Sequence, residues 1–266
     1  MKPLRLSARL LFILATAIPL LPSALAQQAT GSADTPTVAE QYLLSAANQE
    51  RAARNLPLLR RDPQLARAAM QHARLMAEHG AISHQFPGEP ELASRAKSAG
   101  VAFSLIAENV AEAPSSIQIQ QMWMHSPEHR ANMLNPNTDS AGIAVVARNG
   151  QLYAVEDFTK TVPATGLAAQ ESAIGALVAR TGRIALDTAP GDISAARRTC
   201  AMSTGYAGPR KPWFVMRFTS NDLTQLPSEL KSQLASGRYR QASVGACAVN
   251  STGPFAAYSF AVLLFP

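Results

Sequence analysis

Two apolar segments joined by Asn149-Gly150 constrain the fold of this chain more than any other feature. The segments read "GIAVVAR" and "QLYAVEDF", and both carry β-branched or aromatic residues. Asn and Gly readily adopt the positive φ values that a two-residue hairpin turn requires, so this pair is a strong hairpin signal. We therefore predict an antiparallel pair of strands flanking Asn149-Gly150.

Helical patterns occupy most of the chain before this hairpin. Apolar residues recur near a 3.6-residue spacing from Val38 onward. Asp62 followed by Pro63 predicts the N-cap and first turn of a second helix, which Gly80 would end. Helices followed by an antiparallel strand pair make residues 38–160 an α+β domain. Further helices are expected over residues 90–100, 115–126 and 127–134.

The first 26 residues have the pattern of a secretory signal peptide, with a basic start, the apolar stretch "LLFILATAIPLL" and small residues before the cleavage point. We expect cleavage after Ala26, a secreted or periplasmic location and a flexible linker over residues 27–37. No later apolar stretch is long enough to span a bilayer. Three of the 24 Lys+Arg lie in this peptide, which leaves 21 against 18 Asp+Glu and a net charge of +3. Nucleic-acid binding is therefore not expected.

Residues 165–266 are expected to form a second, smaller α+β module. Cys200 and Cys247 both lie in it, and an isolated cysteine pair in an exported protein is most simply a disulfide. No internal repeat is visible in the sequence. The expected elements are a helix near 168–180, a strand over 213–218, a helix interrupted at Pro227 and a final hairpin.

Four polar residues interrupt or adjoin apolar segments of the first domain: His84, Glu108, His129 and Glu156. Charged and polar side chains are uncommon in such surroundings, and these four come from four separate elements, as the lining of a cleft would. Imidazoles and carboxylates are ordinary ligands of zinc and similar ions. Taken alone, these residues fit independent, locally satisfied polar groups better than a site.

The motifs "SHQF", "AENVA" and "MWMHSPEHRANML", followed by a Gly-led hairpin, resemble a bacterial CAP domain in their order. This superfamily comprises the cysteine-rich secretory proteins, antigen 5 and the plant pathogenesis-related 1 proteins. The resemblance covers about residues 38–160. It implies a three-layer α-β-α sandwich with a central cleft, in which a His/Glu cluster binds divalent cations in some members.

The resemblance assigns roles residue by residue. His84 matches the first cleft histidine, and His129 matches the histidine of the Ser-Pro-x-His-Arg motif. Glu108 matches the glutamate of the Gly-Glu-Asn motif, although Ala107 replaces its glycine. Glu156 falls where the last strand commonly carries glutamine. The Gly-His-Tyr motif is absent, so a four-ligand cluster of the eukaryotic type is not expected, and His84 and His129 are the candidate metal ligands.

The other histidines near these motifs have simpler interpretations. His125 is expected to cap the carbonyls at the end of its helix, and Ser126 to be the N-cap of the next helix. A hydrolytic triad of Ser126, His129 and Glu108 is disfavoured, because no nucleophile elbow or oxyanion loop accompanies the serine. His72 and His79 are expected to be partly buried helix residues.

Three functions are compatible with these residues and with the resemblance. The favoured one is binding of an envelope, lipid-like or cell-wall ligand in a His/Glu cleft, together with a divalent cation such as zinc. The first alternative is a metal-assisted hydrolase in which Glu108 is the general base. The second is a non-catalytic interaction scaffold whose C-terminal module carries recognition.

Overall fold

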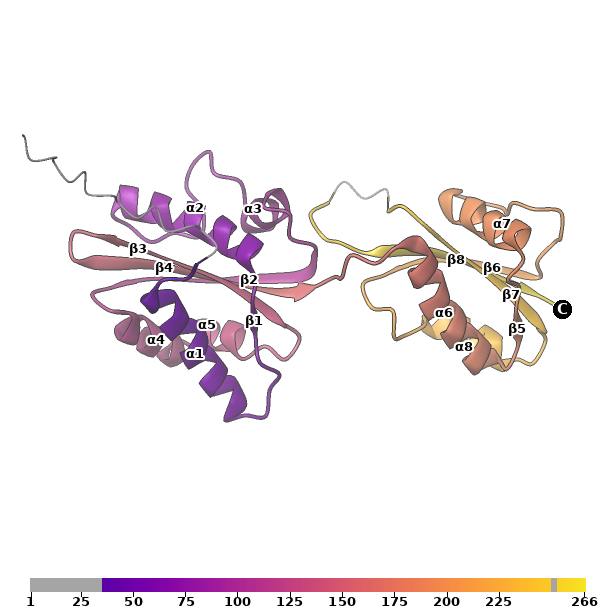
Figure 1. Cartoon of the computed structure of the whole chain (residues 1–266), viewed down its shortest axis with the longest axis horizontal. Coiled ribbons are helices and arrows are strands. Elements are labelled where there is room, and N and C mark those ends of the chain that lie inside the picture. Colours follow the sequence, from indigo (N-terminus) through magenta and orange to yellow (C-terminus); the bar gives the residue numbers. More distant parts are fainter. Residues whose placement is uncertain (1–34, 250–252) are drawn as a thin grey trace, which may run out of the picture. The chain divides into compact units, whose positions relative to one another are not determined.

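The described residues contain two modules, each built on one four-stranded sheet. The computed structural model describes residues 35–249 and 253–266 (Figure 1). The predicted signal peptide, its cleavage site after Ala26 and most of the predicted linker over 27–37 lie outside the described residues. None of the described helices is long and apolar enough to cross a membrane.

The sheet of the N-terminal module has the strand order β1-β3-β4-β2. Its strands are β1 (Arg60–Arg61), β2 (Phe103–Ala113), β3 (Ser140–Arg148) and β4 (Gln151–Thr161). Its helices are α1 (Val38–Ala52), α2 (Pro63–His79), α3 (Leu92–Ser98), α4 (Ser116–His125) and α5 (Pro127–Met133). α2 and α3 cover one face of the sheet, and α1, α4 and α5 cover the other (Figure 1). The predicted three-layer α-β-α sandwich is confirmed.

The helix ends of this module follow from local chemistry. The Asp62 side chain accepts hydrogen bonds from the backbone N–H groups of Gln64 and Leu65, which have no partner inside α2. Gly80 ends α2 with φ of 60°, a left-handed conformation that suits glycine. The predicted N-cap and C-cap of α2 are both confirmed.

The predicted hairpin is confirmed, and one glycine in it sets how closely a helix approaches the sheet. β3 pairs antiparallel with β4, and Asn149 and Gly150 have φ of 51° and 77°. A Cβ atom added at Gly142 of β3 would lie 2.4 Å from the backbone of Ala66 in α2. Only glycine therefore fits where α2 lies against β3.

Strand β2 was not predicted, although it carries Glu108. Glu108, Asn109 and Glu112 break the apolar pattern of the segment, and each of them has a specific partner in the folded module. Tertiary contacts, which a local pattern does not report, therefore determine this strand.

The C-terminal module has the strand order β5-β7-β8-β6. Its strands are β5 (Ala185–Leu186), β6 (Phe214–Ser220), β7 (Gln241–Cys247) and β8 (Tyr258–Phe265). Its helices are α6 (Leu167–Gly182), α7 (Pro190–Ala201) and α8 (Ser228–Ala235). α7 was not predicted, and the predicted helix around Pro227 is shorter, because α8 begins after this proline. Cys200 of α7 and Cys247 of β7 form the predicted disulfide, with Cα atoms 5.8 Å apart.

The two modules repeat one topology, although the sequence shows no repeat. In each, a short strand pairs parallel with the first strand of a hairpin, and the second hairpin strand pairs antiparallel with the remaining strand. The helices after the short strands, α2 and α7, lie on matching faces. Topology is thus preserved between the modules without a recognisable sequence period.

Candidate functional site

A polar cluster lies between the sheet of the N-terminal module and the helices α2 and α3, and Glu108 is at its centre. Glu108 pairs with Asp157 across β2 and β4, so both side chains point to the face that α2 covers. The Glu108 carboxylate is 3% exposed. His84, in the loop after α2, donates from Nδ1 to Glu108 Oε1 at 2.8 Å.

The second oxygen of Glu108 is bound by an arginine. Arg95 of α3 donates from Nη2 to Glu108 Oε2, and both side chains are 3% exposed. The same guanidinium donates from Nη1 to the backbone oxygens of His84 and Pro90. Arg95 therefore neutralises Glu108 and also holds the loop that carries His84. A buried pair of this kind is costly to break, because the remaining charge would be left without a partner.

A second buried ion pair extends the cluster. His72 of α2 is fully buried, and its ring nitrogens lie 2.7 Å from Glu89 Oε1 and 2.7 Å from the backbone oxygen of Ser83. Both partners accept hydrogen bonds, so the ring donates from both nitrogens when Glu89 is ionised. Arg95 and His72 then balance Glu108 and Glu89. The expectation of partly buried histidines is wrong for both residues, because His72 is fully buried and His79 is exposed.

Asp157 completes the cluster in its neutral form. It is fully buried on β4, and burial followed by the charge of Glu108 raises its pKa well above the usual range. A protonated Asp157 adds no charge, and it can donate a hydrogen bond to the neighbouring Glu108 carboxylate.

Asparagines on the other face of β2 position His129. Asn109 is fully buried and donates to the backbone oxygen of His129 at 3.0 Å. Asn132 of α5 donates to Asn109 Oδ1 at 3.0 Å and to the backbone oxygen of Glu108 at 3.2 Å. Two neighbouring residues of β2 thus bind segments on opposite faces of the sheet. Glu108 binds His84 in the loop after α2, and Asn109 binds α5.

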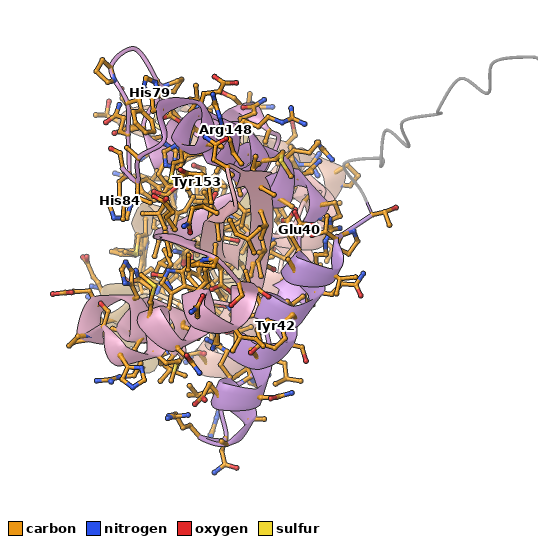
Figure 2. All side chains as sticks on the ribbon, turned by 90° about the vertical axis from the view of Figure 1, so that its left-hand side faces the viewer. Glu40, Tyr42, His79, His84, Arg148 and Tyr153 are labelled. Carbon is orange, nitrogen blue, oxygen red and sulfur yellow. A yellow bond between two sulfur atoms is a disulfide. The ribbon has the colours of Figure 1, made fainter. Side chains whose placement is uncertain are left out.

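His129 lies near His84 without a direct contact between the rings. Burial lowers the pKa of His129, and the charge of His84 lowers it further, partly offset by Glu128. The structure therefore brings His84 and Glu108 into contact, while His129 is linked to them only through the charge of His84, which lowers its pKa. Figure 2 shows His84 at the outside of the module, and its side chain is 64% exposed.

Glu156 lies on the opposite face of the sheet from Glu108, because its neighbour in the strand, Asp157, points to the α2 side. It is fully buried, and burial raises its pKa to about 8 against the opposing charge of Arg51. Arg51 of α1 is itself buried and donates to the backbone oxygens of Pro57, Met133, Asn135 and Thr138. Glu156 is thus not a partner of His84, and its setting is structural.

The remaining sequence-predicted residues have local roles. His125 donates from Nδ1 to the backbone oxygen of Gln121, and Ser126 is the N-cap of α5, so both capping predictions are confirmed. His79 stacks on Phe86 with ring centres 4.3 Å apart. These two rings line a pocket of about 410 Å³ that also reaches Glu89 and Arg95 of the cluster.

Over residues 35–249 and 253–266, no group of three or more His, Cys, Asp or Glu side chains is placed to hold an ion. Glu108 is the reason, because both of its oxygens already accept from Arg95 and His84. His84 and His129 remain as two imidazoles.

Four residues of the site were not predicted from the sequence: Arg95, Asp157, Glu89 and Asn109. Arg95 and Glu89 looked like ordinary surface charges of a short helix and a loop. The one usable signal was Asp157, which directly follows Glu156 in an apolar strand segment. Two consecutive carboxylates in such a strand place one acid on each buried face.

Comparison with known proteins identifies relatives of this module. Residues 44–158 match the sequence model of the cysteine-rich secretory protein family (CAP). The uncharacterized protein YkwD of Bacillus subtilis (strain 168) is 27% identical over 118 residues, which are 44% of this chain and 46% of that protein. The chain thus covers less than half of the length of this curated relative.

Solved structures show the same kind of likeness. An extracellular protein containing an SCP domain, from Bacillus anthracis, is 29% identical with a TM-score of 0.44, over 46% of this chain and 40% of that chain. An outer surface protein from Borrelia burgdorferi is 23% identical with a TM-score of 0.44, over 46% of this chain and 92% of that chain.

Proposed function

We propose that the N-terminal module, whose residues 44–158 match the sequence model of the CAP family, is part of an exported protein and binds a small envelope, lipid-like or cell-wall ligand at His84 and His129. The observation that carries the proposal is the contact of His84 Nδ1 with Glu108 at 2.8 Å. In the neutral tautomer that donates from Nδ1, Nε2 carries the lone pair, on a ring that is 64% exposed. Glu108 thus holds an imidazole in one orientation and one tautomer.

This geometry favours binding over hydrolysis by Glu108. A general base needs a free carboxylate oxygen within reach of a water molecule. Both Glu108 oxygens are engaged, and the group is 3% exposed. Its role in the proposal is to orient His84, while Arg95 binds its second oxygen.

The donor set also limits the cation that the site would hold. Zinc in catalytic sites has three protein ligands, and here His84 and His129 are the two imidazoles available. We propose that they bind a divalent cation such as zinc weakly, with water at the other positions. Because each imidazole must be neutral to bind, affinity should fall below roughly pH 6.

Calorimetric titration of the full chain with zinc tests this function. Loss of a group that only orients a ligand already weakens metal sites about 10–100-fold, so His129→Ala should weaken zinc binding at least about tenfold. His125→Ala is the matched control, since His125 only caps its own helix. Equal affinity of His129→Ala and the unchanged chain would remove His129 from the site, and a larger loss at His125 would show that the site lies elsewhere.

A further inference from the structure

The two modules differ in charge. Residues 38–160 carry 11 Lys+Arg and 12 Asp+Glu, whereas residues 165–266 carry 10 Lys+Arg and 5 Asp+Glu, a net charge of +5. Few of these cations pair with a carboxylate inside the C-terminal module, although several donate to neutral oxygens within it. Among its described residues, ion pairs engage only Arg197, with Glu171, and Arg210, with Asp187. The excess positive charge is therefore available to an external partner.

Half of these cations gather at one end of the module. The backbone N–H of Ala185 donates to the Arg240 oxygen, and the N–H of Arg240 donates to the Phe265 oxygen. The ends of β5, β7 and β8 therefore meet there, close to the C-terminus (Figure 1). The basic end, as we name it, consists of five exposed cations and one aromatic residue: Arg183, Arg210, Lys211, Arg238, Arg240 and Trp213.

Contacts place the segments of the basic end side by side. Arg210 donates to Gln241, at the start of β7, and to Asp187, after β5, and its guanidinium lies 3.5 Å from the ring centre of Phe265. Trp213 lies at the same strand end, because its backbone N–H donates to the backbone oxygen of Leu264. Asp187 is the one carboxylate in these contacts, and Arg210 neutralises it.

Trp213 is the most exposed aromatic residue described, with 65% of its surface open. An exposed indole on a surface whose segments carry several cations is typical of proteins that lie at the headgroup level of a bilayer. Each Lys or Arg near an anionic membrane adds to the attraction. Because the five cations come from separate segments, they suit an extended anionic surface better than a single phosphate group.

We propose that the basic end docks on an anionic phospholipid surface, with Trp213 at the headgroup level. This surface lies in the C-terminal module and does not depend on the function proposed for His84 and His129. The bilayer would bury the exposed indole, and the cations would lie against the lipid phosphates.

Trp213 is a built-in probe for this proposal. The chain has two tryptophans, and Trp123 is fully buried in the N-terminal module. Adding phosphatidylcholine vesicles that contain phosphatidylglycerol should shift tryptophan emission to shorter wavelength. Vesicles of phosphatidylcholine alone should not, and Trp213→Ala should abolish the shift.

Co-sedimentation with the same vesicles measures affinity. The double variant Arg183→Glu/Arg240→Glu should bind at least about tenfold more weakly, because it removes two attractive charges and adds two repulsive ones. The control Arg54→Glu/Arg198→Glu makes the same change in net charge on exposed residues outside the basic end. Circular dichroism would confirm that all variants fold.

Three outcomes would overturn the proposal. Equal loss in the two double variants would mean that net charge alone acts. Equal binding to vesicles with and without phosphatidylglycerol would exclude recognition of lipid charge. Binding of a soluble polyphosphate without binding of vesicles would show that the partner is a dissolved polyanion.

Discussion

The two modules place different chemistry at matching positions of one fold. The N–H groups of Arg60 and Asp62 donate to the oxygens of Asp139 and Ala141, and those of Ala185 and Asp187 donate to the oxygens of Arg240 and Ala242. When the two sheets are superposed on these bonds, each buried acid has an equivalent position in the C-terminal module. Glu108 corresponds to Val215, Asp157 to Leu263 and Glu156 to Val262. Acids in one module are thus aliphatic side chains in the other.

The helices that follow the short strands differ in the same way. Counted from the proline at the first position of each helix, His72 of α2 matches Thr199 of α7, and both are fully buried. His72 is paired with Glu89, whereas Thr199 donates to the oxygen of Ala195 in its own helix. In the C-terminal module the disulfide joins α7 to β7 directly. The fold therefore does not need the polar cluster, which supports a functional reason for it.

Removing the buried Arg95 should have the largest effect on stability. It would test whether the positive and negative charges of the cluster neutralise one another. Arg95→Ala leaves Glu108 buried without its neutralising partner, so the free energy of unfolding should fall by about 3–5 kcal/mol. Hydrogen exchange should quicken in residues 38–160 and stay unchanged in residues 165–266. The matched control is Arg54→Ala, whose pair with Glu50 is exposed on both sides and should contribute about 1 kcal/mol or less. Equal costs for the two variants would contradict the account.

Breaking the disulfide should have the next largest effect, confined to the other module. The bond closes a loop with a sequence separation of 47, for which chain entropy gives about 4 kcal/mol, less any strain. Cys200→Ala/Cys247→Ala should therefore speed hydrogen exchange in residues 165–266 and leave residues 38–160 unchanged. Faster exchange in both regions would show that the modules do not differ in what stabilises them.

A smaller effect, seen as a pH slope, distinguishes the buried acids from their aliphatic counterparts. The folded-state pKa of Glu156 is about 8, against an ordinary value of 4.5. Between these values the unfolded chain has released a proton that the folded chain retains. Stability from this group is therefore complete below about pH 4.5 and is lost as pH rises, by about 1.4 kcal/mol per pH unit.

Glu156→Gln should remove that contribution and raise stability at pH 7 relative to the unchanged chain. Urea unfolding at several pH values measures the slope. Glu50→Gln is the control, because Glu50 is paired with Arg54 at the surface. A slope that Glu156→Gln does not change would show that this carboxyl is ionised in the folded module.

The fold was more predictable than the site, for a physical reason. Caps at Asp62, Gly80 and Ser126 and the Asn149-Gly150 turn are chosen by their own backbone neighbours, so a local pattern reports them. Arg95 and Asp157 acquire their roles from Glu108, a residue distant in the chain. The local sequence of Arg95 carries no trace of that contact, and that of Asp157 indicates only a buried acid. The resemblance to a family located His84, Glu108 and His129, and it could not show that Glu108 is already occupied.

Imidazole NMR of the full chain during a zinc titration tests the central claim most directly. The chain has five histidines, and the account predicts that two of them respond together. The Nε2 signal of His84 and the ring signals of His129 should move in a saturable way, with His84 Nδ1 protonated throughout because it donates to Glu108. His72, His79 and His125 should not respond. The account would be contradicted if the ring signals of His125 or His79 shifted in place of those of His129. It would also be contradicted if the His84 ring lacked a proton on Nδ1.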